Sequence, residues 1–479
     1  MGAPLSDGSA GPRRRFRAAD LRWGVLLPFL IPFLDVESPF FLAAPGVLGL
    51  SAASAAACAF LLSRLAGPPG RSLWAWVILL VFVQGYYVKS YWFARIVQTP
   101  GFMLVNHELY WLSADQIAAG LVPITWAFCT FCVVAWVLLG PVPTEVTTAE
   151  EPPPSDESRA LSLIALATAV GFAAGAVQWY LGFGVMGVEN DPLPLRLDTI
   201  IVRTRAELVP GLIYLGIWSV DRSRRWTTWA VAAGSLLLMA GLDTVLSTSR
   251  GSFARYGLPV LFLWLLTGRL TARRAAFVAL TLLLTLALHP VASALRAQRM
   301  SESMVARGGE ELDAADGSTL FTLGVMASRV GGAEGVWYVA GRMDEGVDAA
   351  RVVDHLSGAL PIHVYHTRAI VGLPAIVDFR SPGLLGGLML LGGRAWWLWL
   401  LAGYAAAVRL GWGGLSRLRT AAVARSIAAM QCLLQSMEGT FQAQNVGSML
   451  ATILVVELAQ RRFLGRRGPD GGRRALNGS

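Results

Sequence analysis

The chain alternates between long apolar runs and short polar connections along almost its whole length. A helix that crosses the hydrocarbon core of a bilayer needs about 20 mostly apolar residues. By this criterion the pattern predicts about 12 membrane-spanning helices, several of them shorter than that length. The predicted spans are residues 23–34, 40–62, 73–88, 117–139, 160–181, 209–220, 226–246, 256–266, 275–291, 384–408, 421–437 and 446–458.

This pattern predicts an all-α, polytopic transmembrane protein with one large extracytoplasmic loop. The loop, residues 292–382, is far longer than the other connections, and its apolar pieces at 320–330 and 336–340 favour a folded segment. The expected parts of the chain are a basic cytoplasmic arm (1–22), a membrane domain (23–464) that includes the loop, and a disordered cytoplasmic tail (465–479).

Arginine is concentrated in alternate connections, which is how the positive-inside rule marks the cytoplasmic side of a membrane protein. We therefore expect a multi-pass protein of the cytoplasmic membrane with both termini in the cytoplasm. The connection at 141–158 is acidic and Pro-rich, but acidic residues carry little weight in the rule. The arginines placed inside by this trace are Arg64, Arg71, Arg222, Arg224, Arg225, Arg269, Arg273, Arg274, Arg409, Arg417, Arg419, Arg461, Arg462, Arg466 and Arg467.

Composition excludes a soluble enzyme. Hydrophobic residues make up 54% of the chain and charged residues only 15%, too few to cover a water-facing surface. The net charge of +9 comes largely from loops and tails, so we expect the lipid bilayer and no nucleic acid as a partner. Cys129 and Cys132 form a C-x-x-C pair inside an apolar run, where cysteine behaves as a small hydrophobe, and no metal site is predicted.

The predicted outer face carries many arginines, against the usual bias. Arginine presents a rigid fork of donors that matches the oxygens of phosphate, so a pyrophosphate held at the membrane surface would explain the pattern. The alternative is that these arginines are solvated and paired with nearby Asp and Glu. The outer arginines are Arg250, Arg255, Arg296, Arg299, Arg307, Arg329, Arg342, Arg351, Arg368 and Arg380.

Arg250 and two histidines stand out among the outer residues. Arg250 lies between two apolar spans, and an ionisable residue at membrane depth is a functional candidate, unless its side chain extends to the interface. His363 and His366 lie near the end of the large loop, just before a span. Histidine can exchange a proton near neutral pH, although a pair of ordinary surface histidines would look the same.

Three segments of the chain resemble motifs of the bacterial O-antigen polymerase and ligase superfamily, the oligosaccharide repeat unit polymerases. Residues 247–252, Ser-Thr-Ser-Arg-Gly-Ser, are similar to the Ser-Arg-Gly motif that opens a span on the outer face. Residues 327–335, Ala-Ser-Arg-Val-Gly-Gly-Ala-Glu-Gly, resemble the second arginine motif, in the large loop. The run from His363 to Gly386 resembles the histidine-containing end of that loop and the Gly-rich entry into the next span.

The resemblance implies a glycosyltransferase that polymerises or ligates oligosaccharides carried on polyprenyl pyrophosphate, with lipid-linked donor and acceptor. It implies no metal and no cofactor, and it brings flippase or chain-length regulator proteins as further partners. His366 precedes Gly383 by a longer stretch than in ligases, which favours polymerase. By resemblance, Arg250 and Arg329 hold the pyrophosphate, with Arg255, Arg368 and Arg380 as second choices. By resemblance too, His366 is the catalytic base, with His363 or Glu334 as substitutes.

Two other functions stay open. A GT-C glycosyltransferase would use an acid after the first span, and Asp35 and Glu37 occupy that position. A transporter of lipid-linked glycan is the non-enzymatic alternative, although transporters often show two related halves, which this sequence lacks. A purely structural membrane protein would leave Arg250 unexplained.

Overall fold

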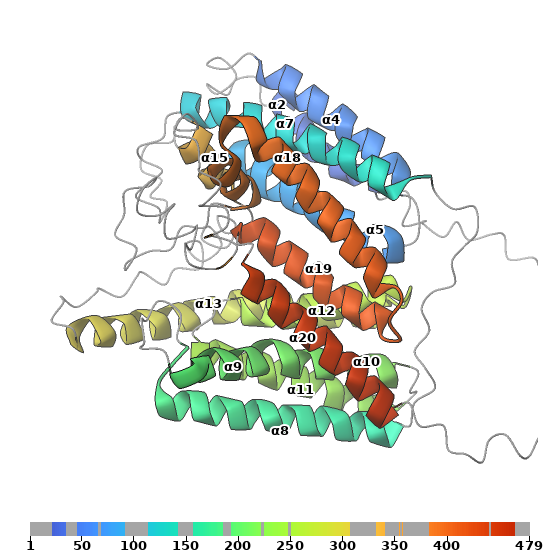
Figure 1. The fold of residues 1–479 in the computed structure, drawn as a ribbon, viewed down its shortest axis with the longest axis vertical. Coiled ribbons are helices and arrows are strands. Elements are labelled where there is room, and N and C mark those ends of the chain that lie inside the picture. The colour runs from blue at the N-terminus through green and yellow to red at the C-terminus, as the bar shows by residue number, and fades with distance from the viewer. Residues whose placement is uncertain are drawn as a thin grey trace, which may run out of the picture.

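The computed structural model describes thirteen stretches and single residues of the chain, and every secondary-structure element within them is helical (Figure 1). The all-α class predicted from the apolar runs is therefore confirmed for the described part of the chain. The described residues are 22–34, 46–65, 69–91, 114–141, 157–184, 193–221, 225–247, 251–306, 332–340, 354, 357, 383–439 and 442–464.

Each of the twelve predicted spans lies almost wholly in helix wherever its residues are described, and residues 40–45 of the second span lie outside the described part. Six segments are long and apolar enough to cross a membrane: Val47–Arg64, Pro69–Tyr91, Ala119–Leu139, Glu157–Leu181, Thr227–Ser247 and Ala272–Ala292. The principal helices are η1 (Arg22–Leu30), α2 (Ile31–Leu34), α4 (Val47–Arg64), α5 (Pro69–Val81), η2 (Phe82–Val88), α7 (Ala114–Leu139), α8 (Glu157–Leu181), α10 (Val209–Val220), α11 (Trp226–Ser247), α12 (Ser252–Leu266), α13 (Ala272–Ala306), α18 (Gly383–Leu415), α19 (Ala421–Glu438) and α20 (Ala443–Ala459).

The helices enclose two hydrophobic cores. The first is formed mainly by η1, α4, α5, η2, α7 and α18, and includes the fully buried rings of Phe82 and Phe128. The second is formed mainly by α8, α10, α11 and α12, and includes Trp264 and Tyr256. Helices α12 and α19 contribute to both cores, and in Figure 1 they lie between the upper and lower groups of helices. These shared helices join the two groups into one bundle.

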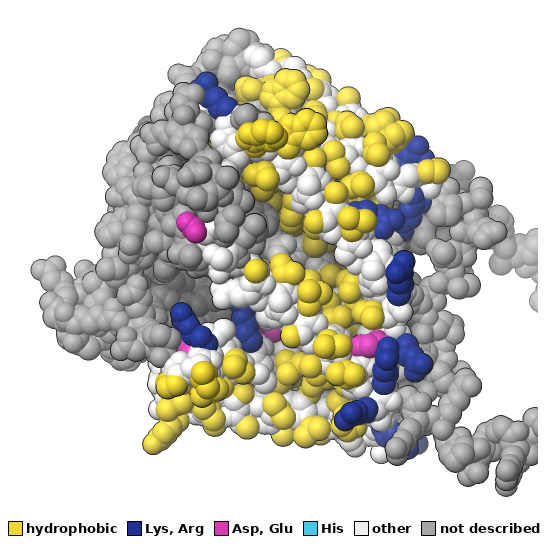
Figure 2. All heavy atoms as spheres, in the orientation of Figure 1, with side chains coloured by type: hydrophobic (Ala, Val, Ile, Leu, Met, Phe, Trp, Pro, Cys, Tyr) yellow, Lys and Arg dark blue, Asp and Glu magenta, His cyan; other side chains and the backbone are white. Residues whose placement is uncertain are grey.

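The outer surface of the bundle is apolar. Side chains as large as Trp126, Trp179 and Trp399 are exposed by 62%, 62% and 71%. Figure 2 shows hydrophobic side chains over much of the described surface between the two ends of the helices. A soluble monomer rarely exposes apolar patches this extensive, whereas a bilayer accommodates them. The exposed apolar surface and the six long apolar helices are the features of a multi-pass membrane protein.

The basic connections of the sequence meet at one end of the bundle, which we call the basic end. Arg71 Nη1 donates to the carbonyl oxygen of Pro141 at 2.7 Å, joining the start of α5 to the end of α7. Arg269 and Arg274 form ion pairs with Asp221, at 2.8 and 2.5 Å, and join α12 and α13 to α10. In Figure 2 many of the Lys and Arg side chains lie along the right-hand edge, which is the basic end, and others lie on the left.

The remaining helix termini meet at the opposite end. The backbone N–H of Leu385, at the start of α18, donates to the Tyr86 hydroxyl at 3.1 Å. Arg203 Nη2 donates to Asn445 Oδ1 at 2.5 Å and joins the segment before α10 to the start of α20. These contacts place the starts of α18 and α20 at the end of the bundle opposite the basic end.

Three features differ from the prediction or extend it. Residues 182–208 were predicted to be an outer loop, but α9 (Leu197–Arg203) and η5 (Thr204–Leu208) run directly into α10. Helix α13 continues to Ala306, well into the predicted large loop. Helix α18 is broken at Gly393, whose φ of 53° and ψ of −160° suit only glycine. The predicted helical piece at 336–340 lies within α15 (Ala333–Ala340), whereas the piece at 320–330 lies outside the described residues.

Candidate functional site

Few of the residues singled out in the sequence lie in the described part of the chain. Arg255 is in the first turn of α12, with 31% of its side chain exposed. The backbone of Glu334 lies in the first turn of α15. The other candidates lie outside the described residues: Arg250, Arg329, Arg368, Arg380, His363, His366, Asp35 and Glu37.

Two of the three motif segments touch through their backbones. A Cβ atom added to Gly383, at the start of α18, would lie 2.4 Å from the Cα atom of Gly332. One added to Gly386 would lie 2.9 Å from the carbonyl carbon of Gly335. Contacts this short leave no room for any side chain, which explains why both segments are rich in glycine. The Gly-rich end of the second motif therefore packs directly on the Gly-rich start of the third.

The C-terminus of α19 connects this contact to the first motif segment. Gly439, which follows α19, has a φ of 69°, and a Cβ atom there would lie 2.1 Å from the carbonyl oxygen of Gly383. The preceding residue, Glu438, interacts electrostatically with Arg255. Two of the motif segments therefore meet at the end of α19, and Arg255, three residues beyond the first segment, feels the charge of Glu438 there.

Asp243 holds the first motif segment in place. Ser252 Oγ donates to Asp243 Oδ2 at 2.7 Å, and Ser247 Oγ donates to Oδ1 at 3.2 Å. These two serines are the first and last residues of the Ser-Thr-Ser-Arg-Gly-Ser run. Asp243 therefore fixes the end of α11 and the start of α12, on either side of the position of Arg250.

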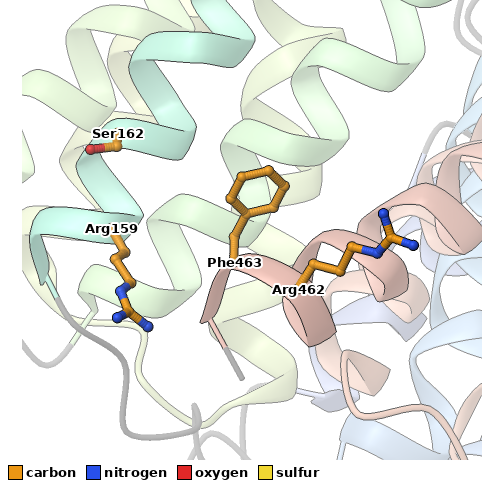
Figure 3. Close-up of a pocket in the computed structure, with 4 residues that line it drawn as sticks. All are labelled: Arg159, Ser162, Arg462 and Phe463. Atoms are coloured by element: carbon orange, nitrogen blue, oxygen red, sulfur yellow. The ribbon is translucent and has the colours of Figure 1, made fainter. Parts of the chain in front are cut away.

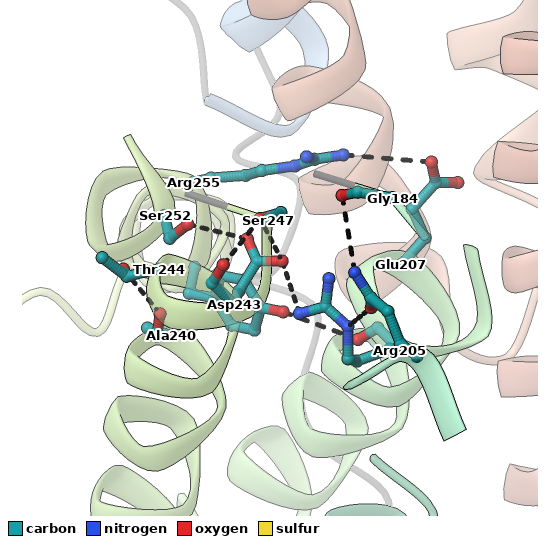
Figure 4. A network of polar contacts seen from close by, with 11 residues as sticks. Gly184, Arg205, Glu207, Ala240, Asp243, Thr244, Ser247, Ser252 and Arg255 are labelled. Carbon is teal, nitrogen blue, oxygen red and sulfur yellow. Dashed lines mark hydrogen bonds and ion pairs between the residues drawn. The ribbon is translucent and has the colours of Figure 1, made fainter. Parts of the chain in front are cut away.

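A buried ion pair lies behind this turn (Figure 4). Arg205 Nη1 contacts Asp243 Oδ1 at 2.6 Å, and the two side chains are exposed by 0% and 2%. Arg205 Nε also donates to Gln178 Oε1 at 2.8 Å. Its third nitrogen, Nη2, is buried and has no hydrogen-bond partner among the described residues. A charge enclosed in a membrane protein costs free energy unless it is paired. Such residues are functional candidates, so the Arg205–Asp243 pair is one as well.

A second, half-exposed cluster of charges lies beside the buried pair. Arg203 Nη1 and Ser448 Oγ both donate to the Glu207 carboxylate, and Arg255 Nη2 lies 3.9 Å from Glu207 Oε1. The side chain of Glu207 is 16% exposed, and those of Arg203 and Arg255 are each 31% exposed. Figure 4 shows the Arg255–Glu207 contact above the Arg205–Asp243 pair. Two guanidinium groups from different helices therefore face one carboxylate at the opposite end of the bundle.

The chain matches no protein-family model, no curated protein and no solved structure. The likeness to the O-antigen polymerase and ligase superfamily therefore stays an expectation that rests on the three motif segments. The arrangement itself is suited to binding an anion. A guanidinium group that donates hydrogen bonds to a carboxylate can donate them to a phosphate in the same geometry. Among the described residues no group of three or more His, Cys, Asp or Glu could hold a metal ion.

Sequence reasoning missed Arg205, Asp243 and Glu207. Asp243 carried a usable signal, because it is an isolated acid inside the predicted span 226–246. Arg205 and Glu207 gave no such signal, because the sequence pattern places them in a predicted outer loop and not in a span. They lie instead in a π-helical turn, η5, whose extra residue interrupts the α-helical register; such turns occur often at functional sites.

A hollow lies at the basic end, with a volume of about 250 Å³ and a lining of Arg159, Ser162, Arg462 and Phe463 (Figure 3). Figure 3 shows the guanidinium groups of Arg159 and Arg462 pointing away from each other. They do not converge on one position, in contrast to Arg203 and Arg255. The hollow therefore lacks the geometry of a binding site.

Proposed function

We propose that this chain is a membrane glycosyltransferase that transfers an oligosaccharide repeat unit from polyprenyl pyrophosphate to a growing glycan. The observation that carries the proposal is the backbone contact of two motif segments at the end of α19, together with the arginine–carboxylate cluster around Glu207, in which Arg255 follows the first motif segment. Arginines that gather at one end of an apolar bundle fit a phosphate group on a lipid, because its chain lies in the bilayer while its charge stays at the surface.

In the proposed reaction, the bond between the anomeric carbon of the donor sugar and the pyrophosphate oxygen breaks. The pyrophosphate leaves with the electron pair, and an acceptor hydroxyl oxygen forms the new glycosidic bond. Arginines stabilise the charge that develops on the leaving group. Arg255 takes part in this role together with Arg250, Arg329, Arg368 and Arg380. His366 receives the proton of the acceptor hydroxyl, with His363 or Glu334 as substitutes.

The proposal includes a topology. All twelve helices cross the cytoplasmic membrane, with the basic end and both termini in the cytoplasm. The opposite end then faces outward, together with the large loop at 292–382. The charge distribution supports this orientation, because the arginines at the basic end come from alternate connections of the sequence.

The test uses the purified full chain and a polyprenyl-pyrophosphate-linked oligosaccharide, without nucleotide sugar or added metal. Wild type is compared with Arg250→Ala, with Arg255→Gln, and with Arg196→Gln as an exposed control on the same end of the bundle. A ladder of lengthened products, lost in the first two variants and kept in the control, is the expected result. Transfer to another acceptor without lengthening would identify a ligase.

The GT-C alternative predicts a different outcome in the same assay. It would consume a single sugar on polyprenyl phosphate, and activity would disappear in Asp35→Asn and Glu37→Gln. The polymerase proposal expects both variants to stay active. Consumption of the single-sugar donor, with no product from the lipid-linked oligosaccharide, would overturn it.

One observation favours a second candidate, a transporter of lipid-linked glycan. The Arg205–Asp243 pair is fully enclosed between helices, and buried charge pairs mark substrate and ion pathways in transporters. A transporter would move a lipid-linked oligosaccharide across the membrane of a proteoliposome without changing its length. Movement without lengthening would support this candidate and contradict the glycosyltransferase.

A further inference from the structure

We infer that Glu207 occupies, as an internal counter-anion, an anion-binding clamp between Arg203 and Arg255, and that a phosphate or pyrophosphate group of the substrate replaces its carboxylate there. The inference rests on the proposed function for its choice of substrate, a lipid-linked phosphate. The binding of an anion in the clamp can be tested without any turnover.

The first step is the geometry of the carboxylate. Glu207 Oε1 accepts from Arg203 and faces Arg255 at 3.9 Å, while Oε2 accepts from the Ser448 hydroxyl. Arg203 and Arg255 belong to different helices, and Ser448 belongs to a third, α20. Donor groups from three helices therefore surround this carboxylate. The same groups can bind the oxygens of a phosphate.

The second step is the strength of the contacts. The Arg203 contact spans four residues of one helical segment, and the Arg255 contact, at 3.9 Å, is close to the limit for an ion pair. All three side chains are partly exposed, and ion pairs of this kind contribute about 0.2–1 kcal/mol. A pyrophosphate carries more charge and more acceptor oxygens than one carboxylate, so it can compete for both guanidinium groups.

The third step is the environment under the clamp. The Arg205 guanidinium is fully buried there, and its Nη2 atom has no hydrogen-bond partner among the described residues. Asp243 balances one positive charge of the site, and Glu207 balances another. Displacement of Glu207 would leave Arg203 and Arg255 without this carboxylate, and the incoming phosphate would supply the missing negative charge.

The experiment measures binding of two probes to the purified full chain in detergent: inorganic pyrophosphate, and polyprenyl pyrophosphate. Glu207→Gln removes the competing charge and keeps the shape of the side chain. Its matched control is Asp198→Asn, on the neighbouring helix α9, whose carboxylate accepts hydrogen bonds from Leu193 and Thr199. Arg203→Gln tests the clamp itself, with the exposed Arg196→Gln as its control.

We expect Glu207→Gln to bind both probes about fivefold more tightly than wild type, the factor that corresponds to loss of a partly exposed ion pair. Asp198→Asn and Arg196→Gln should stay within about twofold of wild type, because neither side chain forms an ion pair with Arg203, Glu207 or Arg255 among the described residues, and the exposed charge of Arg196 is screened. Arg203→Gln should bind about fivefold more weakly. Tighter binding of polyprenyl pyrophosphate alone would identify the lipid-borne group as the ligand, and an equal effect on both probes would identify the pyrophosphate group.

Unchanged or weaker binding in Glu207→Gln would overturn the inference, as would the absence of pyrophosphate binding in wild type and in all variants. A thermal melt distinguishes loss of binding from loss of folding: Glu207→Gln should melt lower without anion, yet gain more from added pyrophosphate. Failure of the proposed function is separate. If the variants change pyrophosphate binding as expected but no oligosaccharide is transferred, the anion-binding clamp is supported and the proposed glycosyl transfer is contradicted.

Discussion

At the scale of single residues, the buried Arg205–Asp243 pair is the most constrained feature of the molecule. Asp243 accepts from Arg205, Ser247 and Ser252, so both of its carboxylate oxygens are satisfied. Burial of two charges gains little net stability over apolar residues of the same shape, but removal of one partner leaves the other uncompensated. The pair therefore fixes the relative positions of η5, α11 and α12.

Replacement of one member of the pair should be more harmful than replacement of both. Arg205→Met should lower the free energy of unfolding by about 3–5 kcal/mol, because Asp243 then stays buried without its counter-ion. The double variant Arg205→Met, Asp243→Leu should lose less than the sum of the single variants. Denaturant unfolding in detergent measures each value. Additive losses would show that the two side chains do not interact energetically.

The hydrogen bond from Ser252 to Asp243 can be compared with one to a neutral acceptor. Ser252 and Ser426 are both fully buried serines; Ser426 Oγ donates to the carbonyl oxygen of Val423 at 2.8 Å. Ser252→Ala should cost about 1.5–3 kcal/mol, and Ser426→Ala about 0.5–1.5 kcal/mol, because a charged acceptor strengthens the bond. Equal losses in thermal unfolding would show that the carboxylate acceptor does not strengthen the Ser252 hydrogen bond.

At the scale of elements, three helix ends meet through glycine. The start of α18, the start of α15 and the end of α19 approach so closely that Gly383, Gly332 and Gly439 are in backbone contact. Gly383 and Gly439 also have positive φ angles, of 65° and 69°. The junction brings the motif segments together without any side chain between them, so its position depends on the backbone alone.

Gly439→Ala should separate close contact from backbone strain when compared with Gly182→Ala. Gly182 has nearly the same φ, 71°, but a Cβ atom there would meet nothing within 4 Å. A left-handed residue with a side chain costs about 1–2 kcal/mol, so Gly182→Ala should lose that amount in denaturant unfolding. Gly439→Ala should lose more, because its Cβ atom would lie 2.1 Å from the carbonyl oxygen of Gly383. Equal losses would contradict the junction.

The elements that were predictable from sequence are those set by local hydrophobicity. Wherever they are described, the apolar runs are helical, because an apolar segment in a bilayer must satisfy its own backbone hydrogen bonds. The segment at 197–208 was missed because its charged residues face other side chains instead of lipid or water. Arg205 is paired with a residue 38 positions later, and Arg203 with one 242 positions later. Such pairings depend on tertiary packing and leave no local pattern.

The candidate site was predictable only in its composition. The sequence drew attention to arginine and to the Ser247–Ser252 turn, and the structure adds the acids that hold them, Asp243 and Glu207. The sequence left open that the outer arginines pair with nearby acids, and Arg255 does contact Glu207. Pairing does not exclude a functional role, since the same donors that hold a carboxylate can bind phosphate.

At the scale of the whole molecule, the two ends of the bundle differ in how their arginines are used. At the basic end, arginines join helix ends by contacts such as Arg71 to Pro141 and Arg409 to Leu138. At the opposite end, Arg205 pairs with Asp243, and Arg203 and Arg255 both face Glu207. Asp221 at the basic end also pairs with two arginines, so the fully buried Arg205–Asp243 pair is what distinguishes the opposite end, and it supports placing the proposed binding and chemistry there.

The proposed orientation predicts which end can be labelled from outside the cell. In a variant whose four native cysteines are replaced by serine, Leu195→Cys and Ser416→Cys place single thiols at exposed positions at the opposite end and the basic end. A membrane-impermeant maleimide should label Leu195→Cys in intact spheroplasts, and Ser416→Cys only after permeabilisation, because the basic connections face the cytoplasm. The reverse result would place the arginine network in the cytoplasm, where a polymerase of exported lipid-linked glycan could not use it. Labelling of both thiols from outside would mean that the two ends lie on the same side of the membrane, which would contradict the spanning arrangement itself.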